Sequence, residues 1–222
     1  MEMDPDRAAL NHQQEHWEKT YVENVDMFGD EPSYPVLKAV ETFRKQKAKT
    51  ILELGSGQGR DTLFLAQQGF RVYALDYSEE GRRTIKKKAR IIGISSSVIT
   101  MHHDIRQRLP FDDNFFDGCY SHMLYCMALT TSELEFLSEE IRRVLKPGSL
   151  NIYTVRHTGD PHYRTGTHRG EDMWEIGGGF VVHFFNREKI EHLATGYQIV
   201  GIEEFEETGL PKKLYLVTLK KS

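Results

Sequence analysis

Residues 50–60 limit what this chain can fold into more than any other segment. A run of hydrophobic and β-branched residues that carries one carboxylate, Glu53, leads into glycines at three alternate positions, Gly55, Gly57 and Gly59. Glycine adopts positive φ and lets a ligand approach the main chain, and the helix that follows such a turn offers unpaired N–H groups. The segment therefore predicts a buried strand that ends in a nucleotide-binding turn.

Two classes of ligand compete for this turn. Dinucleotide-binding folds carry the spacing G-x-G-x-x-G, in which the last glycine permits close packing beneath a pyrophosphate, and an acidic residue about 20 positions further on. Asp76 lies at a suitable distance, but Arg60 occupies the position of that last glycine. A cofactor with a ribose and an amino-acid end but no pyrophosphate suits Glu53, the glycines and Asp76 better than NAD does. S-adenosylmethionine has that chemistry.

Four segments in chain order extend this pattern: residues 51–59, 72–78, 104–111 and 115–120. In combination they resemble the cofactor-site motifs of the class I S-adenosylmethionine-dependent methyltransferases, and the resemblance covers residues 48–155. It implies an α/β, Rossmann-like fold, with a mostly parallel seven-stranded sheet, helices on both faces and an antiparallel last strand. It also implies S-adenosyl-L-methionine as the cofactor and S-adenosyl-L-homocysteine as the product.

Length and composition favour one soluble domain. The chain has 222 residues, of which 39% are hydrophobic and 28% charged, and a net charge of −4. This charge gives no general field to attract polyanions, so nucleic acid is a disfavoured partner but not an excluded one. No apolar run approaches the ~20 residues that span a bilayer, and the first residues are acidic, so we expect a cytoplasmic protein without a membrane partner. The sequence leaves the oligomeric state open.

Neither a disulfide framework nor a metal site is expected. Cys119 and Cys126 are seven residues apart without a C-x-x-C pattern, and we interpret both as buried thiols. The histidines at 157, 162 and 168 match no helical pair of metal ligands and no carboxylate-histidine motif.

Periodicity and capping residues predict alternating helices and strands. We expect helices over residues 12–28, from Ser33 onward, and after the caps Ser78, Thr130 and Asn186. The predicted strands begin at residue 50 and cover residues 71–75, 97–102, 115–121, 150–155, 198–205 and 214–219. The last two would pair as an antiparallel hairpin across a turn that contains Gly209 and Pro211.

The whole chain, residues 1–222, is predicted to be a single methyltransferase domain. We expect N-terminal cap helices over residues 1–47, a cofactor-binding core over 48–155, a substrate-lid insert over 156–185, and the last helix and strand hairpin over 186–222.

The acidic residues of the core have distinct predicted roles. Glu53 would act through water or backbone near the methionine moiety, while Gly55, Ser56 and Gly57 leave room for that moiety; a carboxylate satisfied by local amides is the alternative. Asp76 would accept both ribose hydroxyls, because two vicinal donors match the two oxygens of one carboxylate. The alternative is that Asp76 does not bind a ligand and is only a polar residue that flanks the next helix.

Further cofactor contacts follow from the strand ends. Strands of a parallel sheet that alternate with helices bind ligands beyond their carboxyl ends, and Gly55, Asp76, Asp104 and Ser121 all fall there. The resemblance implies that Asp104 accepts from the adenine amino group, with the backbone of Ile105 beside it. Tyr77 would either stack on the adenosine face or pack as an ordinary aromatic.

The segment after the fourth strand is where the substrate of the resembled family faces the methyl group. His122 and Tyr125 are the candidates there for positioning or general-base work. A histidine that only packs under the cofactor remains an open alternative for His122. In the insert, His157, Tyr163 and Arg164 belong to a polar, glycine-rich segment that we interpret as a substrate lid.

The N-terminal residues favour a small acceptor. Trp17 and Tyr21 form a leading Trp-x-x-x-Tyr pattern similar to that of the thiopurine and tellurite-resistance methyltransferases, in which such a helix closes over the site. No Asn/Asp-Pro-Pro-Tyr run follows the fourth strand, where residues 121–124 stand instead. We therefore predict methyl transfer to a small-molecule acceptor by in-line displacement. A protein or RNA methyltransferase and a non-catalytic S-adenosylmethionine-binding module are the alternatives.

Overall fold

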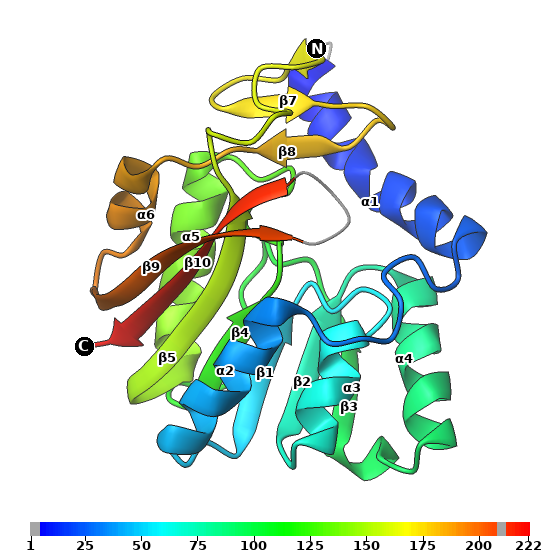
Figure 1. Cartoon of the computed structure of the whole chain (residues 1–222), viewed down its shortest axis with the longest axis vertical. Coiled ribbons are helices and arrows are strands. Elements are labelled where there is room, and N and C mark those ends of the chain that lie inside the picture. Colours follow the sequence, from blue (N-terminus) through cyan, green and yellow to red (C-terminus); the bar gives the residue numbers. More distant parts are fainter. Residues whose placement is uncertain (1–4, 208–211) are drawn as a thin grey trace.

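A large mixed sheet forms the centre of the computed structural model, which describes residues 5–207 and 212–222 (Figure 1). Its seven strands lie in the order β3-β2-β1-β4-β5-β10-β9. They are β1 (Thr50–Leu54), β2 (Arg71–Asp76), β3 (Val98–His102), β4 (Phe116–Ser121), β5 (Leu145–Arg156), β9 (Tyr197–Glu207) and β10 (Lys212–Lys221). In this order, each of the first five strands, from β3 to β5, pairs in parallel with its neighbour, whereas β10 is antiparallel to both β5 and β9. The predicted seven-stranded sheet with an antiparallel last strand is confirmed. The turn predicted around Gly209 and Pro211 lies outside the described residues.

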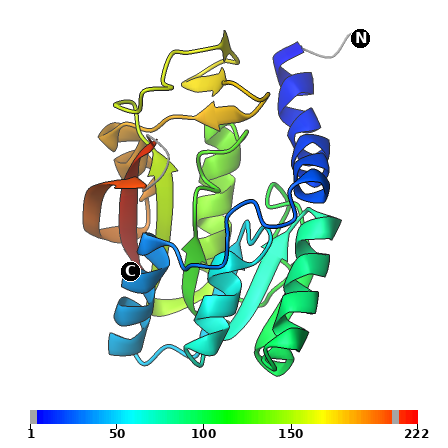
Figure 2. The same ribbon diagram turned by 45° about the vertical axis from the view of Figure 1, so that its right-hand side comes forward.

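Helices cover both faces of the sheet (Figures 1 and 2). They are α1 (Pro5–Glu23), α2 (Tyr34–Lys45), α3 (Arg60–Gln67), α4 (Glu79–Ile91), the 3-10 turn η1 (Ser95–Ser97), α5 (Thr131–Val144) and α6 (Arg187–Leu193). Alternation along β1 divides the core, because successive side chains of a strand point to opposite faces. Ile51 packs in a cluster with α2 and α3, while Leu52 and Leu54 pack with α5 and α6. No helix in the described residues is long and apolar enough to cross a bilayer.

Side-chain caps fix the helix starts that the sequence predicts. Ser33 Oγ accepts from the N–H of Val36, and Ser78 Oγ accepts from that of Gly81. Thr130 forms a capping box at the start of α5, and Asn186 caps α6. These predictions are confirmed, because a cap depends on residues only two or three positions apart.

Two predicted boundaries are wrong. The first helix covers Pro5–Glu23 instead of residues 12–28, because Leu10 packs against the insert at one end and the chain after Glu23 leaves the helix at the other. The fifth strand begins at Leu145, five residues early. Leu145 already pairs with Phe116, and the register then shifts before Gly118 pairs with Leu150. The Pro-Gly pair at 147–148 therefore lies in a β-irregularity and does not precede the strand.

The insert folds into its own small antiparallel sheet of β6 (Thr167–His168), β7 (Met173–Glu175) and β8 (Val181–His183). It lies at the same end of the molecule as α1 (Figures 1 and 2). Gln13 of α1 donates to Gly179 O at 3.0 Å and accepts from Val181 N at 3.0 Å. The ring of Phe180 also contacts Trp17, at 4.7 Å between centroids. The insert therefore supports α1 from outside.

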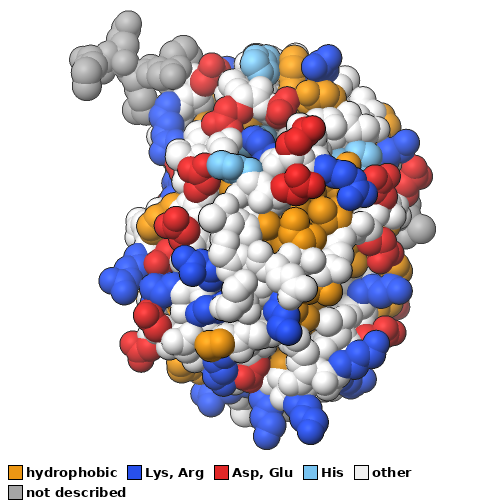
Figure 3. Space-filling model, turned by 90° about the vertical axis from the view of Figure 1, so that its left-hand side faces the viewer, with side chains coloured by type: hydrophobic (Ala, Val, Ile, Leu, Met, Phe, Trp, Pro, Cys, Tyr) orange, Lys and Arg blue, Asp and Glu red, His pale blue; other side chains and the backbone are white. Residues whose placement is uncertain are grey.

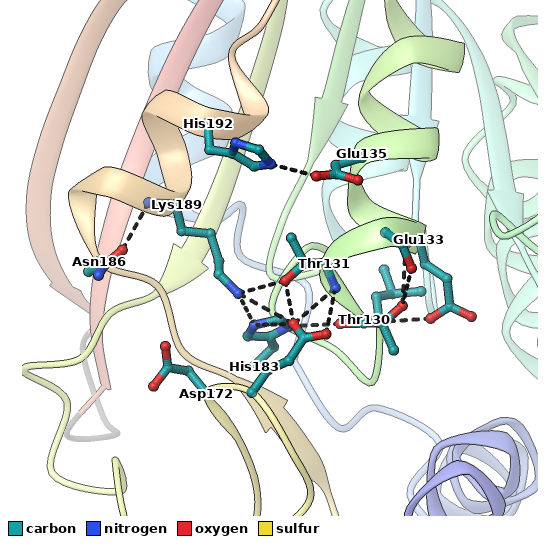
Figure 4. Close-up of polar contacts among 12 residues, drawn as sticks. Thr130, Thr131, Glu133, Glu135, Asp172, His183, Asn186, Lys189 and His192 are labelled. Atoms are coloured by element: carbon teal, nitrogen blue, oxygen red, sulfur yellow. Dashed lines mark hydrogen bonds and ion pairs between the residues drawn. The ribbon is translucent and has the colours of Figure 1, made fainter.

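A buried polar cluster ties the insert to α5 and α6 (Figure 4). The fully buried His183 donates from Nδ1 to Leu129 O at 2.7 Å, while its Nε2 accepts from Lys189 Nζ at 2.5 Å. Lys189 also donates to Thr131 Oγ1 at 3.0 Å, and Glu171 of the insert accepts from Thr131. Burial and the nearby charge of Lys189 lower the pKa of His183 to about 4, so this ring is neutral at pH 7.

Candidate functional site

A cavity of about 340 Å³ lies at the carboxyl ends of β1, β2 and β4. Its wall combines the glycine turn after β1, the ends of β2 and β3, the loop after β4, and the facing ends of β9 and β10. Residues of α1 and of the segment before α2 complete it. This volume is in the range of small-molecule and cofactor sites.

Close packing of the turn requires glycine. The backbone of Gly55 has φ +70°, and a Cβ there would lie 3.0 Å from Leu124 Cδ1. At Gly57, with φ +50°, a Cβ would lie 2.9 Å from Tyr21 Oη. Any side chain here would therefore be strained and would push away the wall of the cavity.

Asp76 holds the turn in place. Its Oδ2 accepts from Gly57 N at 2.7 Å, and its Oδ1 accepts from Ser78 N at 2.8 Å. Burial raises the pKa of Asp76, and these two N–H groups oppose that rise. Each carboxylate oxygen can accept another hydrogen bond, so Asp76 can still receive a pair of vicinal hydroxyls from a ligand in the cavity.

Two polar atoms in the wall have no hydrogen-bond partner in the described part of the chain: Glu53 Oε2 and Ser56 Oγ. Both side chains are buried, with exposed fractions of 4% and 7%. Burial raises the pKa of Glu53 well above its usual value. Because buried polar groups are normally paired, these atoms mark a place where a polar ligand group would bind. Together with Asp76, they fit a ligand with an amino-acid end and a ribose.

The predicted adenine end is only partly assembled. Tyr77 and Ile105 line the cavity, and His103 joins them, but Asp104 does not. Its carboxylate pairs instead with Arg106, whose Nη2 lies 2.7 Å from Oδ2. Although partial burial opposes its charge, the hydrogen bonds from Arg106 lower the pKa of Asp104. The structure therefore does not bring the carboxylate of Asp104 to the wall.

Two other predicted residues also lie behind the wall. Ser121, at the end of β4, is buried and its Oγ has no partner in the described residues. Tyr125 points into the core, where its Oη accepts from Asn151 Nδ2 at 3.0 Å and its ring stacks on Tyr153 at 4.1 Å. The structure therefore does not bring Tyr125 to the cavity, because the loop after β4 turns this side chain toward the core.

His122 does reach the cavity, and two neighbours fix its ring. Its Nδ1 lies 2.9 Å from the hydroxyl of Thr154, whose Oγ1 accepts from Met123 N at 2.8 Å. Its Nε2 lies 3.2 Å from Glu207 Oε1. Met123 adopts φ +60°, which is uncommon outside glycine and is concentrated at functional sites.

Glu207 remains ionised beside this ring. Burial opposes its charge, but the hydrogen bond from His122 and the charges of Lys212 and Arg60 lower the pKa of Glu207 to about 2. An ionised carboxylate accepts only, so Nε2 of His122 carries a hydrogen and donates it to Glu207. Glu207 and Lys212 are not among the predicted site residues, because they come from the last two strands, 85 or more residues beyond His122.

Helix α1 covers the part of the cavity next to the glycine turn. Trp17 and Tyr21 of this helix line the wall. Glu18 accepts from Ser78 Oγ at 2.5 Å and from Glu80 N at 3.0 Å. A carboxylate at the start of α4 is stabilised by the helix dipole, so Glu18 holds α1 against the site.

The segment of residues 24–30, here called the strap, closes the same side. Gln58 in the glycine turn donates to Asn24 O at 2.7 Å and accepts from Met27 N at 3.1 Å. Lys88 of α4 pairs with Asp26 at 2.9 Å and with Asp30 at 2.8 Å. Gln58 and Lys88 are not among the predicted site residues. The side chain of Gln58 bonds to backbone groups, and such partners leave no pattern in the sequence. A polar residue inside a glycine turn was the one feature that could have pointed to Gln58.

The predicted lid residues lie elsewhere. His157 is buried against Tyr215, with 4.6 Å between ring centroids. Tyr163 donates to Asp172 Oδ1 at 2.7 Å, and Arg164 lies over the ring of Tyr163. No residue of the insert lines the cavity. The structure therefore brings none of these three side chains to the cavity, which residues of α1 and of the strap line instead.

The described residues contain two free cysteines and no cluster suited to a metal ion. Cys119 and Cys126 are free and buried, as predicted. Within residues 5–207 and 212–222, no cluster of three or more His, Cys, Asp or Glu side chains is placed to hold a metal ion.

Residues 51–148 match a family described as "Methyltransferase domain". The chain is 39% identical over 102 residues to phosphoethanolamine N-methyltransferase 1 of Triticum aestivum, and the matched segment covers 45% of this chain and 20% of that one. It is 29% identical over 134 residues to cypemycin N-terminal methyltransferase of Streptomyces sp, and the matched segment covers 60% of this chain and 53% of that one. A 64-residue segment is 39% identical to a 23S rRNA (uracil(747)-C(5))-methyltransferase of Pyrococcus abyssi, and covers 29% and 15% of the two chains. The chain thus spans about half or less of these relatives.

Solved structures share the fold. One is the 1,6-didemethyltoxoflavin-N1-methyltransferase of Burkholderia thailandensis with bound 1,6-didemethyltoxoflavin and S-adenosylhomocysteine, with a TM-score of 0.74, 17% identity, and coverage of 100% of this chain and 92% of that one. Another is a SAM-dependent methyltransferase of Methanosarcina mazei, with a TM-score of 0.71, 21% identity, and coverage of 82% and 96%.

Proposed function

The chain belongs to the class I S-adenosylmethionine-dependent methyltransferases, and on that premise we propose that it is a cytoplasmic enzyme that methylates a small-molecule acceptor. One observation carries the proposal. A single cavity joins the orphaned polar atoms of Glu53 and Ser56 to the fixed ring of His122. A cofactor held at the first end would point its reacting group toward the second.

The chain supplies binding, alignment and exclusion of water. S-adenosylmethionine carries the methyl group on a positively charged sulfur, from which an in-line displacement removes it. Asp76 would receive the ribose hydroxyls, and the orphaned oxygen of Glu53 would accept from the amino-acid end. Trp17 and Tyr21 cover this part of the cavity. Alignment and exclusion of water are the main contributions that such a displacement needs.

His122 acts in this proposal as a positioning residue for the acceptor. Because its Nε2–H is held by Glu207 and its Nδ1 by Thr154, the ring has one orientation. The alternative role, in which His122 only packs under the cofactor, does not account for these two hydrogen bonds.

The charge of the chain favours a small acceptor over a macromolecule. The net charge is −4, and acidic and basic side chains are interspersed over most of the face in Figure 3. A net negative charge gives no general field to attract a phosphate backbone. The relatives named as a 23S rRNA methyltransferase and as cypemycin N-terminal methyltransferase keep a macromolecular acceptor as the second candidate.

Calorimetry tests the cofactor first. We expect purified protein to bind S-adenosylhomocysteine in the micromolar range and not to bind NAD. Binding of NAD alone would contradict the assignment. An assay of S-adenosylhomocysteine release against small thiols, amines, hydroxyls and carboxylates then tests the acceptor. If S-adenosylhomocysteine is released only in the presence of RNA, and if salt weakens this activity steeply, the second candidate is favoured. Tight cofactor binding without turnover on any acceptor would indicate a non-catalytic module.

A further inference from the structure

Lys212, the first residue of β10, brings an incompletely paired ammonium group to the cavity. Its side chain is only 15% exposed and lines the wall. The nearest acidic atom is Glu207 Oε2 at 3.9 Å, beyond hydrogen-bond distance, and Nζ has no hydrogen bond in the described residues. Burial lowers the pKa of Lys212. A buried charge without a close partner is costly, which indicates that a partner comes from outside the chain.

Arg60 adds a second set of donors at the same place. Its Nε lies 3.3 Å from Asp61 Oδ1, and its Nη1 lies 3.9 Å from Glu207 Oε1. Neither Nη group makes a hydrogen bond within the part of the chain that the structure describes. The side chain is only 17% exposed, and it also lines the cavity.

Donors outnumber acceptors where these side chains meet. Glu207 alone faces Arg60, Lys212 and His122, and its pKa of about 2 reflects the positive potential there. The neighbouring Asp61 is already engaged, because its oxygens accept from Ser33 and Tyr120 as well. The other carboxylates of the cavity, Glu53 and Asp76, belong to the strands β1 and β2 on the cofactor side.

We propose that Arg60 and Lys212 bind an anionic oxygen group of the methyl acceptor, such as a carboxylate or a phosphate. These two residues, with the neighbouring His122 and Glu207, are here called the donor-rich corner. This inference rests on the proposed function and narrows its substrate to anionic small molecules. An acceptor is favoured over the carboxylate of the cofactor because of strand order. Glu207 and Lys212 come from β9 and β10, which β4 and β5 separate from the cofactor strands β1 and β2.

The test compares matched probes on protein saturated with S-adenosylhomocysteine. Calorimetry measures the binding of 4-hydroxybenzoate against 4-hydroxybenzamide, of acetate against acetamide, and of inorganic phosphate. We expect at least one carboxylate to bind about tenfold more tightly than its amide, which is the size of a charge-assisted hydrogen bond. Lys212→Met should abolish this preference, and Lys212→Arg should retain it. Equal binding of each pair, or no binding of any anion, would overturn the proposal.

The adjacent lysine provides a matched control. Lys213 is 45% exposed and pairs with Glu206 at 3.8 Å, and it does not line the cavity. Lys213→Met should therefore leave the anion preference unchanged, and loss of the preference in this variant would overturn the proposal as well.

Binding of S-adenosylhomocysteine to the same variants separates the two possible sources of the anion. Unchanged cofactor affinity in Lys212→Met supports an acceptor, whereas about tenfold weaker affinity would assign the corner to the cofactor's own carboxylate and overturn the inference. If the unaltered protein fails to bind S-adenosylhomocysteine, the proposed function fails instead. The anion titrations without cofactor still decide whether the corner binds anions.

Discussion

Nε2 of His122 donates to Glu207 Oε1 across 3.2 Å and so joins the end of β4 to the end of β9. Thr154 of β5 holds the other nitrogen of the ring at 2.9 Å. Three strands that are far apart in the sequence therefore set the orientation of one imidazole. Both nitrogens are engaged, which suits a residue that positions an acceptor.

A double-mutant cycle tests this pair. His122→Ala and Glu207→Ala should each destabilise the fold, and together by less than the sum of the single effects. We expect a coupling energy of about 1 kcal/mol for a charge-assisted hydrogen bond that is mostly buried. Urea unfolding of the three variants measures it. Strict additivity would show that the contact contributes nothing in solution.

Asp76 should dominate the affinity for the cofactor. Asp76→Ala removes the acceptor for the ribose hydroxyls and for Gly57 N, so S-adenosylhomocysteine should bind more weakly by roughly 2 to 3 kcal/mol. Asp104→Ala is the comparison, and calorimetry should show an affinity within about threefold of the unaltered protein, because the carboxylate of Asp104 pairs with Arg106 and does not line the cavity. Equal losses in the two variants would restore the adenine role for Asp104.

Gly57→Ala should weaken both folding and cofactor binding. Its Cβ would meet Tyr21 Oη at 2.9 Å, and its φ of +50° is unfavourable for alanine. The expected loss of unfolding free energy is about 1 to 2 kcal/mol. Tyr21→Phe removes the hydroxyl and should recover part of this loss in the double variant, as followed by thermal unfolding. No recovery would mean that backbone strain alone is responsible.

The strap should control the release of the cofactor. Gln58→Ala removes its hydrogen bonds to Asn24 and Met27, so we expect S-adenosylhomocysteine to dissociate several times faster. Stopped-flow displacement measures this rate. Gln68→Ala is the control, because within the described residues the side chain of Gln68 bonds only to Arg44, on the surface. An unchanged rate in Gln58→Ala would show that the strap does not gate the site.

Mild acid should destabilise the insert through His183. The folded-state pKa of about 4 lies below the ordinary value of 6.5, so below pH 6.5 the unfolded chain binds a proton that the folded chain does not. The stability is thus greatest above pH 6.5 and falls toward pH 4. Between pH 7 and pH 5 this histidine should remove on the order of 2 kcal/mol of unfolding free energy. Urea unfolding should show a flatter pH dependence in His183→Gln. The exposed His12→Gln should behave like the unaltered protein.

Local sequence patterns were sufficient for the framework of the fold. The glycine turn, the caps at Ser33 and Thr130 and the apolar strands depend on residues a few positions apart, so their signals lie side by side in the chain. Alternation of these elements then implied the parallel sheet, whose geometry brings strand ends together at one edge. For this reason Gly57 and Asp76 were placed correctly on the same rim.

Local patterns therefore predict the sheet, its helices and the cradle at the ends of β1 and β2. Beyond that cradle, the side chains that face the cavity are set by contacts between segments far apart in the chain. The irregular loop after β4 has no periodicity to show that His122 points inward and Tyr125 into the core. Glu207 and Lys212 reach the site only because β9 and β10 pair beside β5, and such long-range pairing is set by packing of the whole sheet.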